Sequence, residues 1–412
     1  TDILPEFVLT TIDQAVSRAN GNPGGPVHIN CMYREPLAPV KTRSKWASYI
    51  KTIQKWEKGS TVYSKYVLPK PLLGQSDIDH VTLKIGKIKS GLIVVGKLKN
   101  LMEQKNVLML AEKLRWPIFA DISSGLRLGN THKNVIHYFD QILLSDKLKK
   151  NYKPDGILHL GGRITSKRWY EYVEESSPKQ YIMVLKHPLR NDPQHKVTTR
   201  IQCDITSFCH TMKGKIPQRK KNRLLLCLQK LNREVHLKID DLLKTQIGLS
   251  EMRTARCITE SIPSNDGLFI SSSMPIREID MYGAPDKNKI VFGSNRGASG
   301  IDGTIATAIG FSTGLKKRCT LLIGDLAFLH DLNSMAMVRD LKHPMIIVVI
   351  NNNGGGIFSF LPVKQSPKNF EKYFGTPHYL TFSAAADLFD LNYARPETNE
   401  EFAKTYAVAL KS

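Results

Sequence analysis

Two short apolar runs, each ending in a polar or glycine-rich turn, constrain the fold of this chain more than any other feature. Residues 321–323 lead into Gly324-Asp325, and residues 346–350 lead into the turn 351–356. The segment between them, residues 331–341, carries apolar side chains at helical spacing. The order is therefore strand, helix, strand, which predicts two adjacent parallel strands joined by a right-handed crossover.

The carboxyl ends of these strands are the expected place for a divalent metal and a diphosphate, because ligands of parallel sheets bind at that edge. Asp325 and Asn352 both stand there. A carboxylate, a carboxamide and a turn carbonyl are hard oxygen donors, which magnesium prefers while it shares its shell with substrate phosphates. Either segment alone is more often a helix cap or a turn. Their common sheet edge favours the metal site.

The composition is that of a globular chain with two or three domains. Of the 412 residues 41% are hydrophobic, and no apolar run is long enough for a membrane span. The six cysteines show neither CxxC pairs nor metal-ligand spacing. This pattern favours reduced, packed thiols and an intracellular or organellar setting.

The net charge of +22 raises the question of a nucleic-acid partner. The densest basic run, residues 213–223, is short and lacks the interleaved aromatic residues that stack on single strands. Most other Lys and Arg residues are scattered. We therefore expect a solvated surface with a basic linker and no nucleic-acid partner, and anionic small molecules would profit from the same field.

Alternating strand and helix patterns predict an α/β fold of doubly wound parallel-sheet domains. The first block, residues 41–215, has expected strands over 91–96, 117–121, 155–160 and 181–185 and a helix over 101–114. The second block, residues 216–412, has a helical stretch over 224–252 and expected strands over 267–270, 289–292, 320–323 and 345–350. The Leu-Gly-Gly-Arg sequence at 160–163 lacks the G-x-G-x-x-G spacing, which favours structural turns over a nucleotide site.

Residues 1–40 are expected to be the end of a further domain. They hold a helix over 7–20, a strand over 27–30 and an exit through 34–39, too little to enclose a core. No signal peptide is visible, and the pattern at the carboxyl end stops without a clear closing element. We therefore expect the chain to begin partway through a fold and its carboxyl end to be cut short.

Two further loops of the second block follow strands and should reach the same edge. Ser273 can cap a helix whose first turn holds Pro275, and Arg277 stands one turn further along. The glycine-rich loop 293–303 contains Arg296 and leads into a small-residue helix over 304–310, whose amide end favours an anion. A flexible surface loop is the alternative for 293–303. Arginine can grip a carboxylate with two hydrogen bonds, which suits acidic ligands.

Several long motifs resemble one enzyme family. Gly324-Asp325 followed by Asn351-Asn352 is similar to the thiamine-diphosphate motif of the decarboxylase, acetolactate-synthase and transketolase superfamily. More narrowly, the sequences at 25–31, 294–303, 324–333 and 351–361 resemble the MenD family, the 2-succinyl-5-enolpyruvyl-6-hydroxy-3-cyclohexene-1-carboxylate synthases of menaquinone and phylloquinone biosynthesis. The resemblance spans nearly the whole chain, and the basic linker suggests the plant, PHYLLO-type branch.

The resemblance implies roles for individual residues. Asp325, Asn352 and the carbonyl of Gly354 would bind Mg²⁺ or Mn²⁺ and, through it, the diphosphate of thiamine diphosphate. Further cofactor contacts would come from Gly324 and from Ile301, the bulky residue that holds the cofactor bent. The substrate would meet Lys167, Arg168, Ser273, Arg277 and Arg296 and an apolar wall of Ile357, Phe358 and Leu361.

The same resemblance implies a transferase that decarboxylates 2-oxoglutarate and adds the succinyl carbanion in a 1,4 manner to isochorismate. The cofactor would act as the electron sink, while the protein supplies orientation and cationic partners for acidic substrates. A homo-oligomer, dimer or tetramer, is expected, located in the chloroplast for a plant protein and otherwise in the cytoplasm.

One part of the family's machinery is expected to be missing. Residues 41–215 match the central Rossmann-like domain and residues 216–412 the diphosphate-binding domain, but residues 1–40 match only the end of the pyrimidine-binding domain. The family's catalytic glutamate belongs to that domain, and neither Glu6 nor Glu35 lies in the matching motif. We therefore identify no catalytic residue and expect low activity until a pyrimidine-domain chain complements this one.

Three alternatives remain open. The chain could be another thiamine-diphosphate carboligase of the acetolactate-synthase type, although the loop 294–300 and the segment 357–361 argue against it. It could be a non-catalytic subunit that keeps only the cofactor site. A nucleic-acid binder is more remote, and salt-dependent binding to random-sequence duplex would support it.

Overall fold

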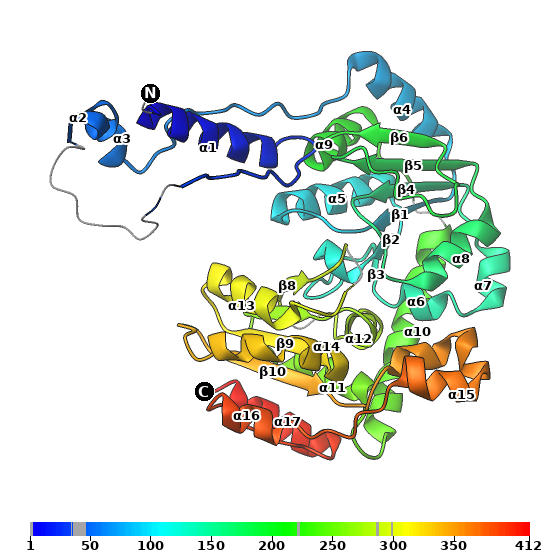
Figure 1. Ribbon diagram of the computed structural model, residues 1–412. Coiled ribbons are helices and arrows are strands. Elements are labelled where there is room, and N and C mark those ends of the chain that lie inside the picture. The colour runs from blue at the N-terminus through cyan, green and yellow to red at the C-terminus, as the bar shows by residue number, and fades with distance from the viewer. Residues whose placement is uncertain (1–2, 34, 36–46, 221–222, 286–287, 298–299) are drawn as a thin grey trace.

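The computed structural model describes residues 3–33, 35, 47–220, 223–285, 288–297 and 300–412. They form two parallel sheets, each between two layers of helices, and an N-terminal arm that stands away from both (Figure 1). Parts of four predicted features lie outside the described residues: the exit at 34–39, the boundary at 40/41, Lys221 and Asn222 of the basic run, and Ala298 and Ser299 of the glycine-rich loop.

The first sheet has six strands in the order β3-β2-β1-β4-β5-β6, and all its ladders are parallel. Its strands are β1 (Gly91–Val95), β2 (Ile118–Ala120), β3 (Val135–Ile136), β4 (Gly156–Leu160), β5 (Gln180–Leu185) and β6 (Thr199–Gln202). Every residue of β1 and β4 is buried. Helices cover both faces, so these strands have apolar side chains without alternation.

Two sets of helices cover the faces of the first sheet. One face packs against α4 (Gln75–Lys87), α5 (Leu101–Leu114) and α9 (Ile205–Lys215). The other packs against α6 (Phe139–Ile142), α7 (Asp146–Asn151), α8 (Lys167–Ser176) and the start of α10 (Arg223–Thr245). Local sequence fixes the start of α5, where Asn100 accepts a hydrogen bond from the Glu103 amide and Glu103 accepts one from the Lys99 amide.

The second sheet has four parallel strands in the order β10-β9-β7-β8. Its strands are β7 (Gly267–Ile270), β8 (Val291–Ser294), β9 (Cys319–Gly324) and β10 (Met345–Ile350). One face packs against α11 (Glu251–Ser261), α12 (Met274–Tyr282) and α17 (Asn399–Ala409), and the other against α13 (Thr304–Leu315) and α14 (Asp325–His330).

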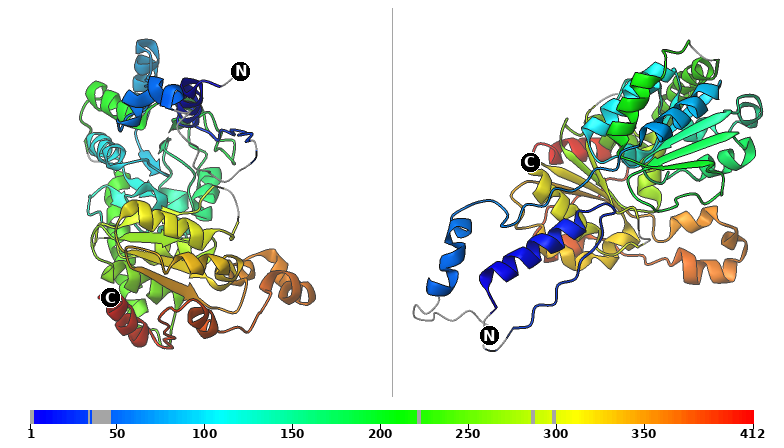
Figure 2. Two further views of the ribbon diagram at one scale, coloured as in Figure 1. Left: turned by 60° about the vertical axis from the view of Figure 1, so that its left-hand side comes forward. Right: turned by 90° about the horizontal axis from the view of Figure 1, so that it is seen from above.

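Two segments project from these layers. The N-terminal arm carries α1 (Pro5–Ala19), α2 (Ala47–Ile50), η1 (Lys51–Ile53) and α3 (Gln54–Glu57), and its α2 and α3 extend beyond both sheets in Figure 1 and in the right-hand view of Figure 2. Beyond β10, a second projection carries η4 (Gly356–Phe360), η5 (Pro362–Gln365), α15 (Pro367–Phe370) and η6 (Glu371–Gly375), after which the chain returns to α16 (Ser383–Leu388). No helix in the described ranges is long and apolar enough to cross a membrane.

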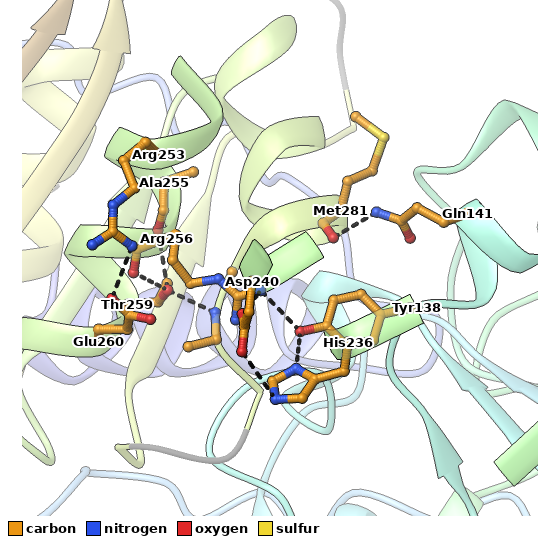
Figure 3. A network of polar contacts seen from close by, with 12 residues as sticks. Tyr138, Gln141, His236, Asp240, Arg253, Ala255, Arg256, Thr259, Glu260 and Met281 are labelled. Carbon is orange, nitrogen blue, oxygen red and sulfur yellow. Dashed lines mark hydrogen bonds and ion pairs between the residues drawn. The ribbon is translucent and has the colours of Figure 1, made fainter. Parts of the chain in front are cut away.

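Buried polar contacts tie the two sheets together. The Arg127 side chain, which follows β2, donates from Nε to the Asp280 carbonyl at 2.8 Å and from Nη2 to the Gly283 carbonyl at 3.2 Å. Beside it, the Tyr138 hydroxyl contacts His236 and accepts a hydrogen bond from Arg256 (Figure 3). These contacts join the loops of the first sheet to α11 and α12 of the second, so that residues from both sheets can contribute to one site.

The expected strands and helices of both blocks are largely confirmed. The helix over 101–114 and the strands over 267–270 and 345–350 have the predicted bounds. The short edge strands β3 and β6 were missed, because so few residues show no clear strand pattern.

Four local predictions were wrong. The helical stretch expected over 224–252 is two helices: α10 ends at Thr245, and Ser250 caps α11 after a break that contains Gly248, whose φ is +78°. Within 331–341, where a helix was expected, the chain forms the 3-10 helix η3 (Leu332–Met337), which follows α14. The strand expected over 289–292 begins at Val291. Residues 27–30 have no ladder partner within the described chain and form no strand.

Candidate functional site

The carboxyl ends of β9 and β10 lie side by side, because the ladder pairs Gly324 with Ile350. Asp325 follows β9 directly and is only 2% exposed. Its Oδ1 accepts the Leu326 amide at 2.7 Å, and its Oδ2 accepts the Gly354 amide at 2.9 Å. The predicted meeting of the two strands at this edge is confirmed, and one of the predicted metal ligands is a buried carboxylate joined to the turn after β10.

Gly354 can be only a glycine in this conformation. Its φ is +136°, and a Cβ atom on it would lie 2.1 Å from the Gly375 carbonyl oxygen. Both the backbone angle and the lack of space exclude a larger residue. The turn is thereby held with its amide directed at Asp325.

Asn352 lies at the same edge but faces a different partner. Its Nδ2 donates to Glu251 Oε1 at 2.9 Å, at the start of α11. Glu251 in turn forms a hydrogen bond with the buried Glu278 of α12. Burial is the main cause that raises the pKa of Glu278 to about 9, and the charge of Glu251 is the second. The Asn352 amide therefore contacts this carboxyl pair and not Asp325.

A hard divalent cation fits the donor chemistry of this edge. The described residues hold no group of three or more His, Cys, Asp or Glu side chains placed to bind a metal. A cation here would depend on the Asp325 carboxylate with neutral oxygens from Asn352 and backbone carbonyls. Such an all-oxygen set, completed by phosphate, suits Mg²⁺ or Mn²⁺ better than a metal that seeks thiolate or imidazole.

The loop after β7 holds a strained serine and a partly desolvated arginine. Ser273 stands before α12 with a φ of +73°, which is rare for a residue with a side chain, and its hydroxyl makes no capping hydrogen bond. The predicted side-chain cap is wrong, whereas Pro275 does lie in the first turn. The Arg277 guanidinium donates to the Ser273 carbonyl. Burial, and then the charge of Arg296, lower the pKa of Arg277.

Arg277 and Arg296 form a positively charged centre between the sheets. Arg296 follows β8, and its charge also acts on Tyr170 of α8, whose pKa is raised mainly by burial. The Ser272 hydroxyl donates to the Asn295 carbonyl at 2.9 Å and so joins the two loops. Within the described ranges neither arginine has an ion-pair partner. Two neighbouring guanidinium groups without a carboxylate attract an anion.

Lys167 and Arg168 are placed differently, although they are neighbours in sequence. Arg168 pairs with the buried Asp140 and reaches Met281 of α12, so it lies at the junction of the two sheets. Lys167 is exposed on α8 and pairs with Glu171 at 3.4 Å. The structure brings Arg168 toward α12 but leaves Lys167 on the surface of its own helix.

The loop before α13 combines an apolar residue with a helix end that is already partly occupied. Ile301 is half-buried and packs against the cluster beneath β9. The Ala306 amide, in the first turn of α13, donates to Asp331 Oδ2 at 3.0 Å. Part of the anion-binding capacity expected at this helix end is therefore taken up by the chain's own carboxylate.

The predicted apolar wall lies on η4 and just beyond it. Ile357 and Phe358 are half-buried, and the Phe358 ring centroid lies 5.5 Å from that of Phe374. Leu361 is 45% exposed. All three follow Gly354 closely, and Ile357 and Phe358 lie on η4, the first helix of the projection beyond β10.

Three residues near the site escaped sequence reasoning. His378 contacts Asp325, Glu251 contacts Asn352, and Tyr170 lies within the field of Arg296. Ser250 before Glu251 is a recognisable helix start, which could have directed attention to Glu251. His378 and Tyr170 carry no such local signal, because only the tertiary fold brings them to the edge.

Comparison with known proteins agrees with this geometry. Residues 47–270 match the family described as the middle domain of thiamine pyrophosphate enzymes, and residues 280–412 match the C-terminal TPP binding domain of thiamine pyrophosphate enzymes. The second match contains Asp325 and the turn after β10.

Curated relatives span the whole chain. A 2-succinyl-5-enolpyruvyl-6-hydroxy-3-cyclohexene-1-carboxylate synthase of Rubrobacter xylanophilus is 38% identical over 98% of this chain and 69% of its own length. The synthase of that name from Prosthecochloris aestuarii is 37% identical over 100% of this chain and 70% of its own length. The chloroplastic protein PHYLLO of Arabidopsis thaliana is 34% identical over 97% of this chain and 25% of its own length. The chain therefore belongs to the 2-succinyl-5-enolpyruvyl-6-hydroxy-3-cyclohexene-1-carboxylate synthase family of thiamine-pyrophosphate enzymes.

Proposed function

We propose that this chain binds thiamine diphosphate through a divalent cation and takes part in the synthase reaction of its family. In that reaction 2-oxoglutarate loses carbon dioxide and the remaining four-carbon unit adds in a 1,4 manner to isochorismate, a step of menaquinone and phylloquinone biosynthesis. The observation that carries the proposal is the contact between the turn after β10 and the buried Asp325 carboxylate, through the 2.9 Å hydrogen bond from the Gly354 amide.

In the proposed site, Asp325, Asn352 and the Gly354 carbonyl hold Mg²⁺ or Mn²⁺, and Gly324 and Ile301 border the cofactor. Bound thiamine diphosphate supplies the electron sink for decarboxylation. The protein's part is to hold the diphosphate at a fixed sheet edge and to keep the reacting centre beside a wall of apolar side chains. The burial of Asp325 supports this role, since a desolvated carboxylate attracts a cation more strongly than an exposed one.

The positively charged centre of Arg277 and Arg296 favours a substrate with two negative charges. Arg277 and Arg296 would bind substrate carboxylates from α12 and the loop after β8, with Arg168 approaching from α8 and Ser273 beside them. Desolvation makes each guanidinium–carboxylate contact stronger than it would be in water. Lys167 would have to leave Glu171 to join them. Ile357, Phe358 and Leu361 would face the ring of the second substrate.

The proposal also covers the domains of the chain, its oligomeric state and its location. Residues 41–215 would act as a central domain and residues 216–412 as the diphosphate-binding domain, with residues 1–40 belonging to a pyrimidine-binding domain. A homo-oligomer in the plastid or the cytoplasm is the expected setting. The identities of 34–38% to synthases of this name favour this function over the acetolactate-synthase type.

Removal of the buried carboxylate tests the proposal. Asp325→Ala should lower Mg²⁺-dependent affinity for thiamine diphosphate by at least about 100-fold, the upper end of what losing a group that supports a metal costs. Asp340→Ala, an exposed aspartate on the crossover between β9 and β10, is the matched control. Calorimetric titration with thiamine diphosphate, with Mg²⁺ and with EDTA, measures both variants.

The wild-type chain and Asp340→Ala should bind the cofactor with Mg²⁺ and lose it with EDTA. Unchanged affinity in Asp325→Ala would place the site elsewhere. Formation of product from 2-oxoglutarate and isochorismate, measured with and without an added pyrimidine-domain chain, then tests the substrate assignment. Turnover with pyruvate alone would favour the acetolactate-synthase type.

A further inference from the structure

We propose that His378 is a positioning residue for Asp325: it holds the carboxylate so that Oδ1 faces the place of the divalent cation. The inference rests on the proposed function, because it concerns how the chain prepares the cation site. His378 belongs to none of the motifs at the ends of β9 and β10 and reaches the site from the segment that returns from α15 and η6.

Three donors fix the orientation of the Asp325 carboxylate. Oδ2 accepts hydrogen bonds from the Gly354 amide at 2.9 Å and from His378 Nε2 at 3.2 Å. Among the described residues, Oδ1 accepts only the amide of its neighbour Leu326, at 2.7 Å. Since each carboxylate oxygen offers about two lone-pair directions, Oδ2 is fully used and Oδ1 keeps one free. The free direction predicts binding of the cation by a single oxygen of Asp325.

The tautomer of His378 follows from its second hydrogen bond. The Leu380 amide donates to His378 Nδ1 at 3.0 Å, so Nδ1 must carry a lone pair. In a neutral imidazole the proton is then on Nε2, the nitrogen that faces Asp325. The ring can therefore donate to the carboxylate without being charged, and the contact leaves the negative charge of Asp325 available to a cation.

The segment around His378 is anchored to the turn after β10. Asn353 Oδ1 accepts the His378 amide at 3.2 Å and the Tyr379 amide at 2.6 Å. The His378 side chain is 11% exposed, and its ring centroid lies 6.0 Å from that of Phe382. The imidazole is thus held in place before any ligand arrives, as expected of a residue that orients a metal ligand.

A buried carboxylate also needs such donors when no cation is bound. Desolvation of an ionised carboxylate is costly unless hydrogen bonds replace the lost water. His378 supplies the only side-chain donor to Asp325 in the part of the chain that the structure describes. The same contact therefore stabilises the Asp325 carboxylate in the absence of a cation and fixes its orientation.

Two polar substitutions of His378 distinguish loss of the hydrogen bond to Asp325 from a change in side-chain size. His378→Gln can place an amide N–H near the position of Nε2, whereas the shorter His378→Asn places it near Nδ1 and cannot reach Asp325. We expect His378→Asn to raise the Mg²⁺ concentration for half-maximal binding of thiamine diphosphate about 10–100-fold, and His378→Gln to stay within about 3-fold of wild type. At saturating Mg²⁺, cofactor affinity should converge in all three proteins.

The measurement is fluorescence or calorimetric titration of Mg²⁺ at fixed thiamine diphosphate, with His330→Asn, an exposed histidine at the end of α14, as control. A merely structural role would lower the melting temperature of metal-free His378→Asn and His378→Gln alike and would not separate their Mg²⁺ requirements. If wild type shows Mg²⁺-dependent binding and His378→Asn matches it, the positioning role is wrong. If wild type shows none, the proposed function itself is wrong.

Discussion

The two sheets share one architecture but differ at their carboxyl edges. In the first sheet, the order of strands reverses between β1 and β4, which is where doubly wound folds bind ligands. In the second, the edge at β9 and β10 holds Asp325, with Arg277 and Arg296 following β7 and β8. The carboxylate that follows β2 in the first sheet, Asp121, instead accepts hydrogen bonds from the Ser123 and Thr165 amides.

Backbone packing closes the edge of the first sheet. A Cβ atom on Gly96 would lie 2.0 Å from the carbonyl oxygen of Gly162, and one on Gly161 would lie 2.6 Å from that of Lys97. Two loops therefore fill the crevice that a nucleotide would need. In the second sheet, Gly354 serves instead to direct an amide at a carboxylate. Glycines at equivalent edges thus have opposite effects, and the sheet order alone does not reveal which edge is a site.

The largest expected effect tests this closure. Gly96→Ala should destabilise the protein by about 3 kcal/mol or more, because the new methyl group overlaps backbone atoms that cannot rotate away. Gly214→Ala in α9, where a Cβ atom meets nothing within 4 Å, is the control and should be neutral or stabilising by about 0.5–1 kcal/mol. Chemical unfolding measures both. Equal stability of the two variants would mean that the first edge is open.

At the edge of the second sheet, loss of an arginine should change ligand binding and not stability. Arg277→Ala is expected to weaken binding of 2-oxoglutarate about 10–100-fold, in the range of a lost charge-assisted hydrogen bond. The affinity of Arg277→Lys should lie between those of the wild type and Arg277→Ala, because lysine keeps the charge but not the two-pronged geometry. Arg339→Ala, which removes an exposed arginine paired with Asp390, is the control. Calorimetry with cofactor and Mg²⁺ present reports the affinity. A variant Arg277→Ala that binds like Arg339→Ala would place the substrate carboxylates elsewhere.

The sequence predicted most of the fold because the longer strands of both sheets are largely apolar runs. The apolar runs within 267–270 and 345–350 are followed by Ser271 and Asn351, so their ends were clear. Edge strands such as Val135–Ile136 are too short to show a period. The break between Thr245 and Ser250 was missed because the apolar pattern continues past it.

The site was predictable where the chain itself brings residues together. Asp325 and the turn after β10 are joined by one strand-helix-strand unit, so spacing placed them correctly. His378 lies 53 positions beyond Asp325 and depends on a projecting segment with no regular period. The φ of +73° at Ser273 has no sequence signal either, because the strain is imposed by the surrounding contacts and not by the residue type.

The smallest expected effect concerns the carboxyl pair beside Asn352. Because the pKa of Glu278 is raised to about 9, the folded protein keeps a proton that the unfolded chain releases above about pH 4.5. Stability should therefore fall as the pH rises from about 4.5 to about 9, and level off above that. Glu278→Gln keeps a neutral hydrogen-bond donor for Glu251 and removes the titrating group. Between pH 7 and pH 8 the free energy of unfolding of the wild type should fall by about 1 kcal/mol, and that of Glu278→Gln should not. Thermal unfolding across this range measures the slope. Parallel slopes in wild type and Glu278→Gln would assign the pH dependence to another group and would leave the orientation of Asn352 without this support.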